Sequence, residues 1–146
     1  MTTTLKPIRS LRPTLDTQFH IDYEWWNKGD RDLRLCLRSH LCAEHRAQLV
    51  EADLDGDMID WIDPNTAEVI RTDALVLLMR THCAHQMNFI GEHTSIVDAA
   101  FRVFLTNDNQ PLTSRQLAEQ INRDAETVLR TIGGKQVYQG IRPVSA

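Results

Sequence analysis

The pattern of apolar and polar positions predicts helices along much of the chain. In residues 30–52, leucines recur at near-helical spacing and arginines fall on the other face, so a long amphipathic helix is expected. The spacing leaves room for an interruption around residues 39–43. A second helix is predicted over residues 74–85, where a leucine-rich composition implies burial.

A β-hairpin is expected between these two helices. Residues 58–62 and 67–71 are rich in residues that favour strands, and the intervening Asp63-Pro64-Asn65-Thr66 has the composition of a tight turn. The predicted fold class is therefore α+β with helices dominating, in which an N-terminal helical region carries the hairpin.

The last third of the chain predicts three further helices and a strand. Residues 96–107 have an inward apolar face and can be capped by Thr94 or Ser95. Thr113 can cap the next helix, and Gln116, three residues later, completes a capping-box spacing. A short helix follows from Asp124 to the pair Gly133-Gly134, and Gln136 to Ile141 has β-rich character.

This order of elements resembles the helix-turn-helix of the winged-helix superfamily over about residues 95–144, with residues 135–144 as a reduced wing. The resemblance implies that the second short helix enters the major groove of DNA. It places three side chains of that helix at the bases: Glu126, Thr127 and Arg130. It positions three cations for phosphate contacts: Arg123, Lys135 and Arg142.

The chain divides into three expected regions. Residues 1–18 look like a flexible arm, residues 19–93 like a helical region with the hairpin and a candidate metal site, and residues 94–146 like the winged-helix-like region. The arm carries Lys6, Arg9 and Arg12 and is read either as a disordered tail or as a basic arm that touches nucleic acid or an acidic partner. The aromatic run from Phe19 to Trp26 is interpreted as docking onto the core rather than as stacking on bases.

Composition and charge qualify the DNA-binding hypothesis. The net charge of the 146 residues is −4, whereas the stretch from Pro111 onward carries a balance of +2. A modest local excess is consistent with phosphate contacts but is far from a strongly basic footprint. A protein–protein interaction module within a larger complex, or a homodimer, is therefore the alternative to DNA binding.

Several features indicate a cytoplasmic protein, and a bacterial origin is expected. No run approaches 18 apolar residues, so no membrane partner is expected. The start of the sequence has no apolar signal region. Three cysteines are an odd number, which does not suit a secreted disulfide framework.

Cysteines and histidines form a candidate zinc site. Cys42 and His45 lie three residues apart, as do His82 and His85, and Cys83 stands beside that second pair. Thiolate and imidazole are ligands that zinc favours, usually four in a tetrahedral structural site. The predicted set is Cys42, His45, Cys83 and either His85 or His82, which would tie the long N-terminal helix to the helix after the hairpin. Structural burial of the cysteines without metal is the competing interpretation.

Other chemistries have weaker signals. An iron–sulfur cluster on Cys36, Cys42 and Cys83 lacks a clustered motif. The acidic run of residues 51–57 resembles a calcium loop, but Ile62 stands where a bidentate glutamate is needed, so a solvated turn is preferred. Walker A, GxGxxG, GxSxG and HExxH motifs are absent, and a thiol nucleophile at Cys83 rests only on its adjacent histidine. The sequence therefore predicts a non-enzymatic DNA-binding protein, a transcriptional regulator in the leading interpretation, with zinc as its candidate cofactor.

Overall fold

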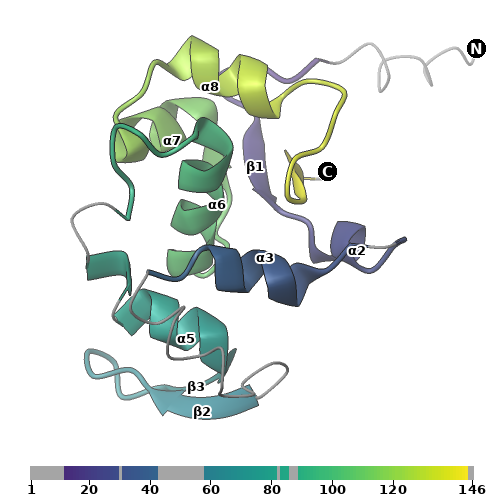
Figure 1. Ribbon diagram of the computed structural model, residues 1–146. Helices are drawn as coiled ribbons and strands as arrows, with labels where there is room; N and C mark the ends of the chain where they lie inside the picture. The colour runs from purple at the N-terminus through teal and green to yellow at the C-terminus, as the bar shows by residue number, and fades with distance from the viewer. Residues whose placement is uncertain (1–11, 30, 43–57, 82, 86–88, 145–146) are drawn as a thin grey trace, which may run out of the picture.

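The computed structural model describes residues 12–29, 31–42, 58–81, 83–85 and 89–144. These residues form a mixed α/β structure, shown in Figure 1. In chain order the elements are β1 (Gln18–Ile21), α2 (Tyr23–Trp26), α3 (Leu33–Ser39), β2 (Met58–Ile62), β3 (Val69–Asp73), α5 (Ala74–Thr81), the 3₁₀ turn η2 (Cys83–His85), α6 (Ile96–Thr106), β4 (Leu112–Thr113), α7 (Ser114–Ile121), α8 (Ala125–Ile132) and β5 (Ile141–Pro143).

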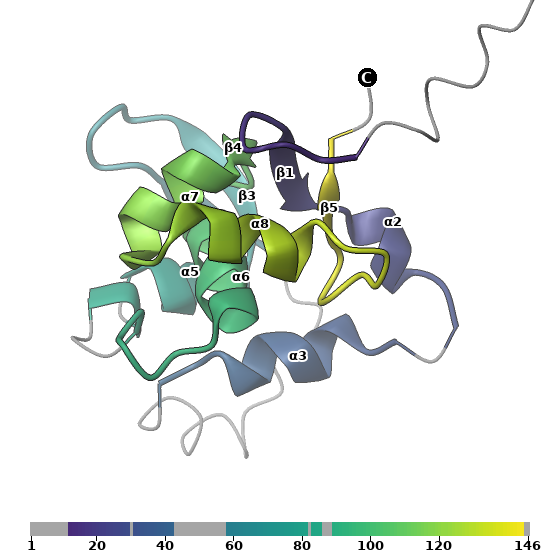
Figure 2. The ribbon, with the colours of Figure 1, turned by 90° about the horizontal axis from the view of Figure 1, so that it is seen from above.

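A three-stranded antiparallel sheet joins the two ends of the described chain. Its order is β4-β1-β5, so the N-terminal strand lies in the middle. Phe19 pairs with Leu112 on one side and with Pro143 on the other. Figure 2, seen from above, shows β1 and β5 side by side next to α8. Segments more than 90 residues apart in sequence therefore share one small sheet.

The core is built around α6. Its buried side chains include Phe101 and Phe104, and the helix contacts α5, α7, α8 and β1. Phe19 and Ile21 alternate inward along β1 and are fully buried against this core. A single hydrophobic cluster contains these residues together with Leu37 of α3, so segments on both sides of position 93 share it.

The helix pair at the end of the chain has the predicted local structure. Thr113 caps α7, and its hydroxyl and the Gln116 side chain form both hydrogen bonds of a capping box. Asn122 then takes the left-handed conformation (φ 57°, ψ 51°), which ends α7. Asp124 caps α8, whose apolar face buries Val128 and Ile132. The helix predicted over residues 96–107 is also confirmed, as α6 with Ser95 as its cap.

The hairpin is confirmed, although its second strand begins later than expected. The prediction was residues 67–71, whereas β3 is Val69–Asp73 and pairs with β2 from Met58 to Ile62. The turn is longer than four residues because Ala67 adopts a positive φ of 62° and its amide donates to the carbonyl of Asp63. A further bond from the Asp63 amide to the carbonyl of Glu68 closes the turn.

The predicted strand over Gln136–Ile141 is wrong. Gln139 and Gly140 both have positive φ, 53° and 79°, and the amide of Ile141 donates to the carbonyl of Tyr138. This tight turn prevents an extended chain, so β5 starts at Ile141. A Cβ at position 140 would lie 2.7 Å from Nε1 of Trp26, which gives a second reason for glycine there.

The helix predicted over residues 30–52 from the leucine spacing ends earlier within the described residues. Within the described residues it is α3, which ends at Ser39 with His40 as its C-cap, at the interruption that the sequence suggested. His40 turns inward and is almost fully buried. Residues 43–52 of the prediction lie outside the described residues, as does the acidic run of residues 51–57.

A buried polar network holds α3 and the 138–141 turn against α6. Arg102 Nε donates to His40 Nδ1 at 2.9 Å, and His40 Nε2 pairs with Gln139 Oε1 at 2.9 Å. Gln139 Nε2 donates to Asp98 at 2.7 Å, and the thiol of Cys36 also donates to Gln139 Oε1 at 3.6 Å. Because Nδ1 accepts, the imidazole is neutral with its proton on Nε2. Burial lowers the pKa of His40, in agreement with that state.

We predict that Ala118→Leu destabilises the protein by about 1–3 kcal/mol, because Ala118 is buried where α7 crosses α8 and a larger side chain would overpack that contact. The measurement is the denaturant midpoint. Gln120→Leu, at an exposed position of the same helix, is the control and should change the midpoint little. Equal midpoints for wild type and Ala118→Leu would mean that the crossing tolerates the larger residue.

We also predict that His40→Leu, a substitution of similar volume, destabilises the protein by about 1–3 kcal/mol, because it leaves Arg102 Nε and Gln139 Oε1 without their imidazole partner in a low-dielectric interior. Urea unfolding measures the effect. His93→Leu is the control, since the His93 side chain is 96% exposed. If both variants unfold at the same urea concentration as wild type, the network contributes no net stability.

Candidate nucleic-acid interface

The outer face of α8 is polar and accessible. Glu126 and Arg130 are exposed on it, whereas Thr127 is partly buried. The carboxylate of Asp124 accepts from both the amide and the hydroxyl of Thr127 at 3.0 Å. These two hydrogen bonds hold the pKa of the Asp124 carboxyl below its ordinary value, and the bond from the Thr127 amide has the larger effect. Asp124 and Thr127 therefore fix the start of α8, and Glu126 and Arg130 are its outward side chains.

A groove of about 700 Å³ opens at the C-terminal end of α8. Three of its lining side chains are cationic and come from three segments of the chain: Arg12, Arg130 and Lys135. The other lining residues are Pro13, Leu129, Gly133, Gly134 and Pro143. Among the described residues that line the groove none carries a carboxylate, so their combined charge is positive.

The N-terminal segment approaches the end of α8 at Gly133, where Pro13 lies nearby. Gly133 caps the helix, and its amide donates to the carbonyl of Leu129 at 2.7 Å. A Cβ at this position would lie 2.6 Å from the Leu129 carbonyl oxygen and 3.4 Å from Cβ of Pro13. The first distance would force a shift of the helix end, so glycine is favoured there, whereas the second is an ordinary van der Waals contact that places Pro13 beside Gly133.

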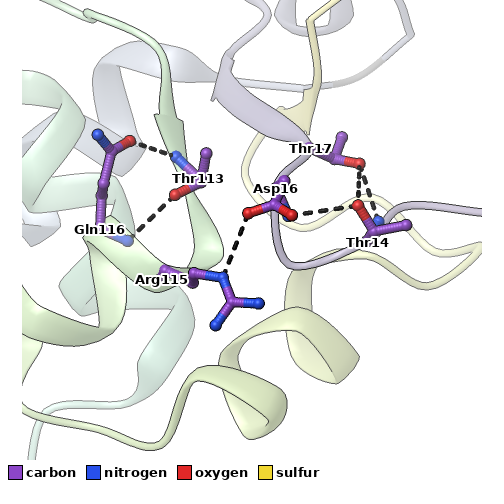
Figure 3. A network of polar contacts seen from close by, with 6 residues as sticks. All are labelled: Thr14, Asp16, Thr17, Thr113, Arg115 and Gln116. Carbon is purple, nitrogen blue, oxygen red and sulfur yellow. Dashed lines mark hydrogen bonds and ion pairs between the residues drawn. The ribbon is translucent and has the colours of Figure 1, made fainter.

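A turn before β1 orients this N-terminal segment (Figure 3). Thr14 donates its amide to the hydroxyl of Thr17 at 2.8 Å, and the amide of Thr17 returns a bond to the carbonyl of Thr14 at 3.1 Å. Asp16 in the same turn forms a 3.2 Å ion pair with Arg115, near the start of α7. That pair is largely exposed and adds little stability. The pairing of β1 within the sheet is the main constraint on where the segment lies.

The remaining two cations proposed for phosphate contact have protein partners. Arg123 donates to the backbone carbonyls of Glu92 and Thr94, which ties the start of α8 to the loop before α6. Arg142 forms a 3.2 Å ion pair with Asp22, the N-cap of α2. Lys135 and Arg130 are exposed at the groove, and Arg130 also donates to the Thr127 hydroxyl at 3.4 Å. Arg12 was grouped in the sequence with the basic arm, but only the fold places it at the same groove as Lys135.

Two of the four predicted zinc ligands lie in contact. The amide of Cys42 donates to Sγ of Cys83 at 3.3 Å, which brings the end of the α3 region to η2. Burial raises the pKa of the Cys83 thiol to about 11; the hydrogen bond from the Cys42 amide acts in the opposite direction, and the Cys42 side chain raises the pKa further. His45 and His82 lie outside the described residues, and the side chain of His85 is not described. Among the described residues, no three histidine, cysteine or acidic side chains gather in a way that could hold a metal ion.

Cys36 takes a different environment from the other two cysteines. It lies on α3, and its thiol donates to Gln139 in the buried network. Burial, with a smaller contribution from the charge of Asp98, raises its pKa to about 11. Cys36 is thus a protonated thiol that serves as a hydrogen-bond donor, which does not suit the three-cysteine cluster considered from sequence.

Comparison with protein-family models, with curated proteins and with solved structures finds no match to this chain. Within the described ranges, none of the helices has the length and apolar character needed to cross a membrane. The described features that bear on function are the α7–α8 pair, the groove at its end and the Cys42–Cys83 contact.

Proposed function

We propose that this protein is a winged-helix-like DNA-binding protein that acts as a transcriptional regulator in the cytoplasm. The observation that carries the proposal is Arg130, exposed on the outer face of α8 and lining the same groove as Arg12 and Lys135, with no carboxylate among the described lining residues. A helix that presents polar side chains beside clustered cations suits the two contacts that DNA offers, base edges and backbone phosphates.

The dimensions of α8 suit a major groove. An α-helix with its side chains is about 10–12 Å across, which fits the major-groove width of about 12 Å, and α8 offers eight residues for the contact. Because the buried face of α8 packs against α7 and the core, Glu126 and Arg130 would point at base edges. Arg130 would donate to a guanine, the commonest specific contact of arginine.

The net charge of −4 limits the affinity for DNA but is compatible with the placement of α8 in the major groove. At physiological ionic strength the Debye length is about 8 Å, so exposed carboxylates farther than that from the phosphates are largely screened. The local charges at the end of α8 then dominate. We accordingly propose binding that weakens steeply as salt rises and that a dimer could strengthen.

We predict that Arg130→Ala and Lys135→Ala weaken DNA binding in different ways. Arg130→Ala should relax specificity by about 1–3 kcal/mol at one base pair, because it removes a base contact. Lys135→Ala should weaken binding to all sequences alike, because it removes a phosphate contact. Fluorescence anisotropy measures both, with a labelled mixed-sequence duplex and with sites selected from a random pool.

Arg71→Ala is the matched control for these variants. It removes the same charge from an exposed position on the hairpin, where Arg71 pairs with Asp60 at 3.2 Å. Its affinity should equal that of wild type. If neither the monomer nor a dimer of the wild-type protein binds any duplex at low salt, the DNA-binding proposal is wrong, and the protein–protein interaction module takes its place.

We further propose that Cys42 and Cys83 are two ligands of a structural zinc ion, completed by His45 and by His85 or His82. The support is the 3.3 Å contact between the Cys42 amide and Cys83 Sγ, because an amide that donates to sulfur stabilises a thiolate ligand. Zinc would replace the proton of the Cys83 thiol, whose loss is otherwise opposed by burial. The ion would hold α3 to the segment that follows α5.

We predict that the protein purifies with about one equivalent of zinc and that chelation lowers its melting temperature, since binding energy at a structural site is folding energy. Metal analysis and thermal melting test this. Cys83→Ser should lose the metal, whereas Cys36→Ser should retain it because Cys36 bonds Gln139 instead. Metal-free protein obtained without any chelator during purification would rule out the zinc site.

A further inference from the structure

The strand order gives the N-terminal segment a position that sequence order would not suggest. β5 follows α8 and pairs with β1, whereas the described chain after α8 pairs with itself in an isolated bridge between Tyr138 and Ile141 and forms no two-stranded ladder. The Val144 amide donates to the carbonyl of Gln18, so the end of β5 runs beside the start of β1. The segment that leads into β1 therefore lies at the edge of the α8 face, where the sequence had suggested a wing formed by residues 135–144.

Arg12 and Lys135 are two of the three cations that line the groove there. Both are exposed, and both line the same groove as Arg130. The close approach of Pro13 to Gly133 positions the backbone that carries Arg12. The nearest acidic residue along that segment, Asp16, is paired with Arg115 on α7 rather than with a groove cation.

The chemistry of the pair indicates a phosphate ligand. Three cations around one open groove repel one another unless an anion lies between them. A guanidinium offers a planar fork that fits phosphate oxygens, and an ammonium offers a point charge with several donors. Because the groove continues from the exposed face of α8, a phosphate held there belongs to the same ligand that α8 contacts.

We propose that Arg12 and Lys135 clamp the phosphodiester backbone of duplex DNA beside the major groove that α8 enters, so that the segment before β1 acts as the second DNA contact of the module. This inference rests on the proposed function and adds a residue from the opposite end of the chain to the interface. Arg12 contributes affinity and orientation, whereas Arg130 contributes sequence preference.

The test is the salt dependence of binding to a labelled mixed-sequence duplex by wild type, Arg12→Ala, Arg12→Lys and the control Arg71→Ala. Removal of one phosphate contact should reduce the slope of log affinity against log salt by about 0.9. The affinity deficit of Arg12→Ala should then shrink about threefold between 50 and 200 mM salt. Arg12→Lys should restore most of the slope, and Arg71→Ala should match wild type. Melting temperatures equal to wild type would show that the exposed Arg12 position leaves folding intact.

The outcomes separate this inference from the proposed function. If wild type binds duplex DNA but Arg12→Ala keeps its slope and affinity, the clamp is wrong and DNA binding stands. If wild type binds no duplex, both fail together. In a third arm, potassium phosphate and potassium chloride are titrated at equal ionic strength. If Arg12 and Lys135 clamp the DNA backbone, the affinity for the duplex should fall equally in the two salts. Release of DNA by phosphate at lower ionic strength would show that the groove is instead a pocket for free phosphate.

Discussion

The position of β1 in the middle of the sheet is the constraint on which the rest of the structure depends. Phe19 and Ile21 are fully buried, and the strand pairs with β4 and β5 at once. Asn109 closes its end, since the side chain accepts from the Ile21 amide at 2.8 Å and donates to its carbonyl at 2.9 Å. These contacts offset the entropy of bringing segments about a hundred residues apart together, and they place the N-terminal segment next to α8.

The buried network around Gln139 makes the second connection between distant parts of the chain. It joins α3 through His40 and Cys36, α6 through Asp98 and Arg102, and the turn that precedes β5. Polar groups in a low-dielectric interior are costly when unpaired, so this arrangement favours one packing of the three segments over others. The stacking of His40 on Phe101 adds contact area to the same junction.

The groove at the end of α8 shows how a chain of negative net charge can present a positive surface. Arg123 and Arg142 are occupied by the carbonyls of the loop before α6 and by Asp22, and so they hold the framework. The groove cations come instead from the segment before β1, the last turn of α8 and the residues after it. Local placement, rather than total charge, decides what such a surface attracts within a Debye length.

The sequence by itself determined the elements whose signals are local. The capping box of Thr113 and Gln116, the cap at Asp124, the apolar period of α6 to α8 and the stop at Gly133 all act within a few residues, so they were predictable. Only the tertiary structure decided the three-stranded sheet and the site. The partner of β5 lies some 120 residues away, and the positive φ at Gln139 is stabilised by a side-chain network that no short window contains. The presence of Arg12 and Lys135 at one groove follows from that same long-range pairing, which depends on packing and not on local sequence.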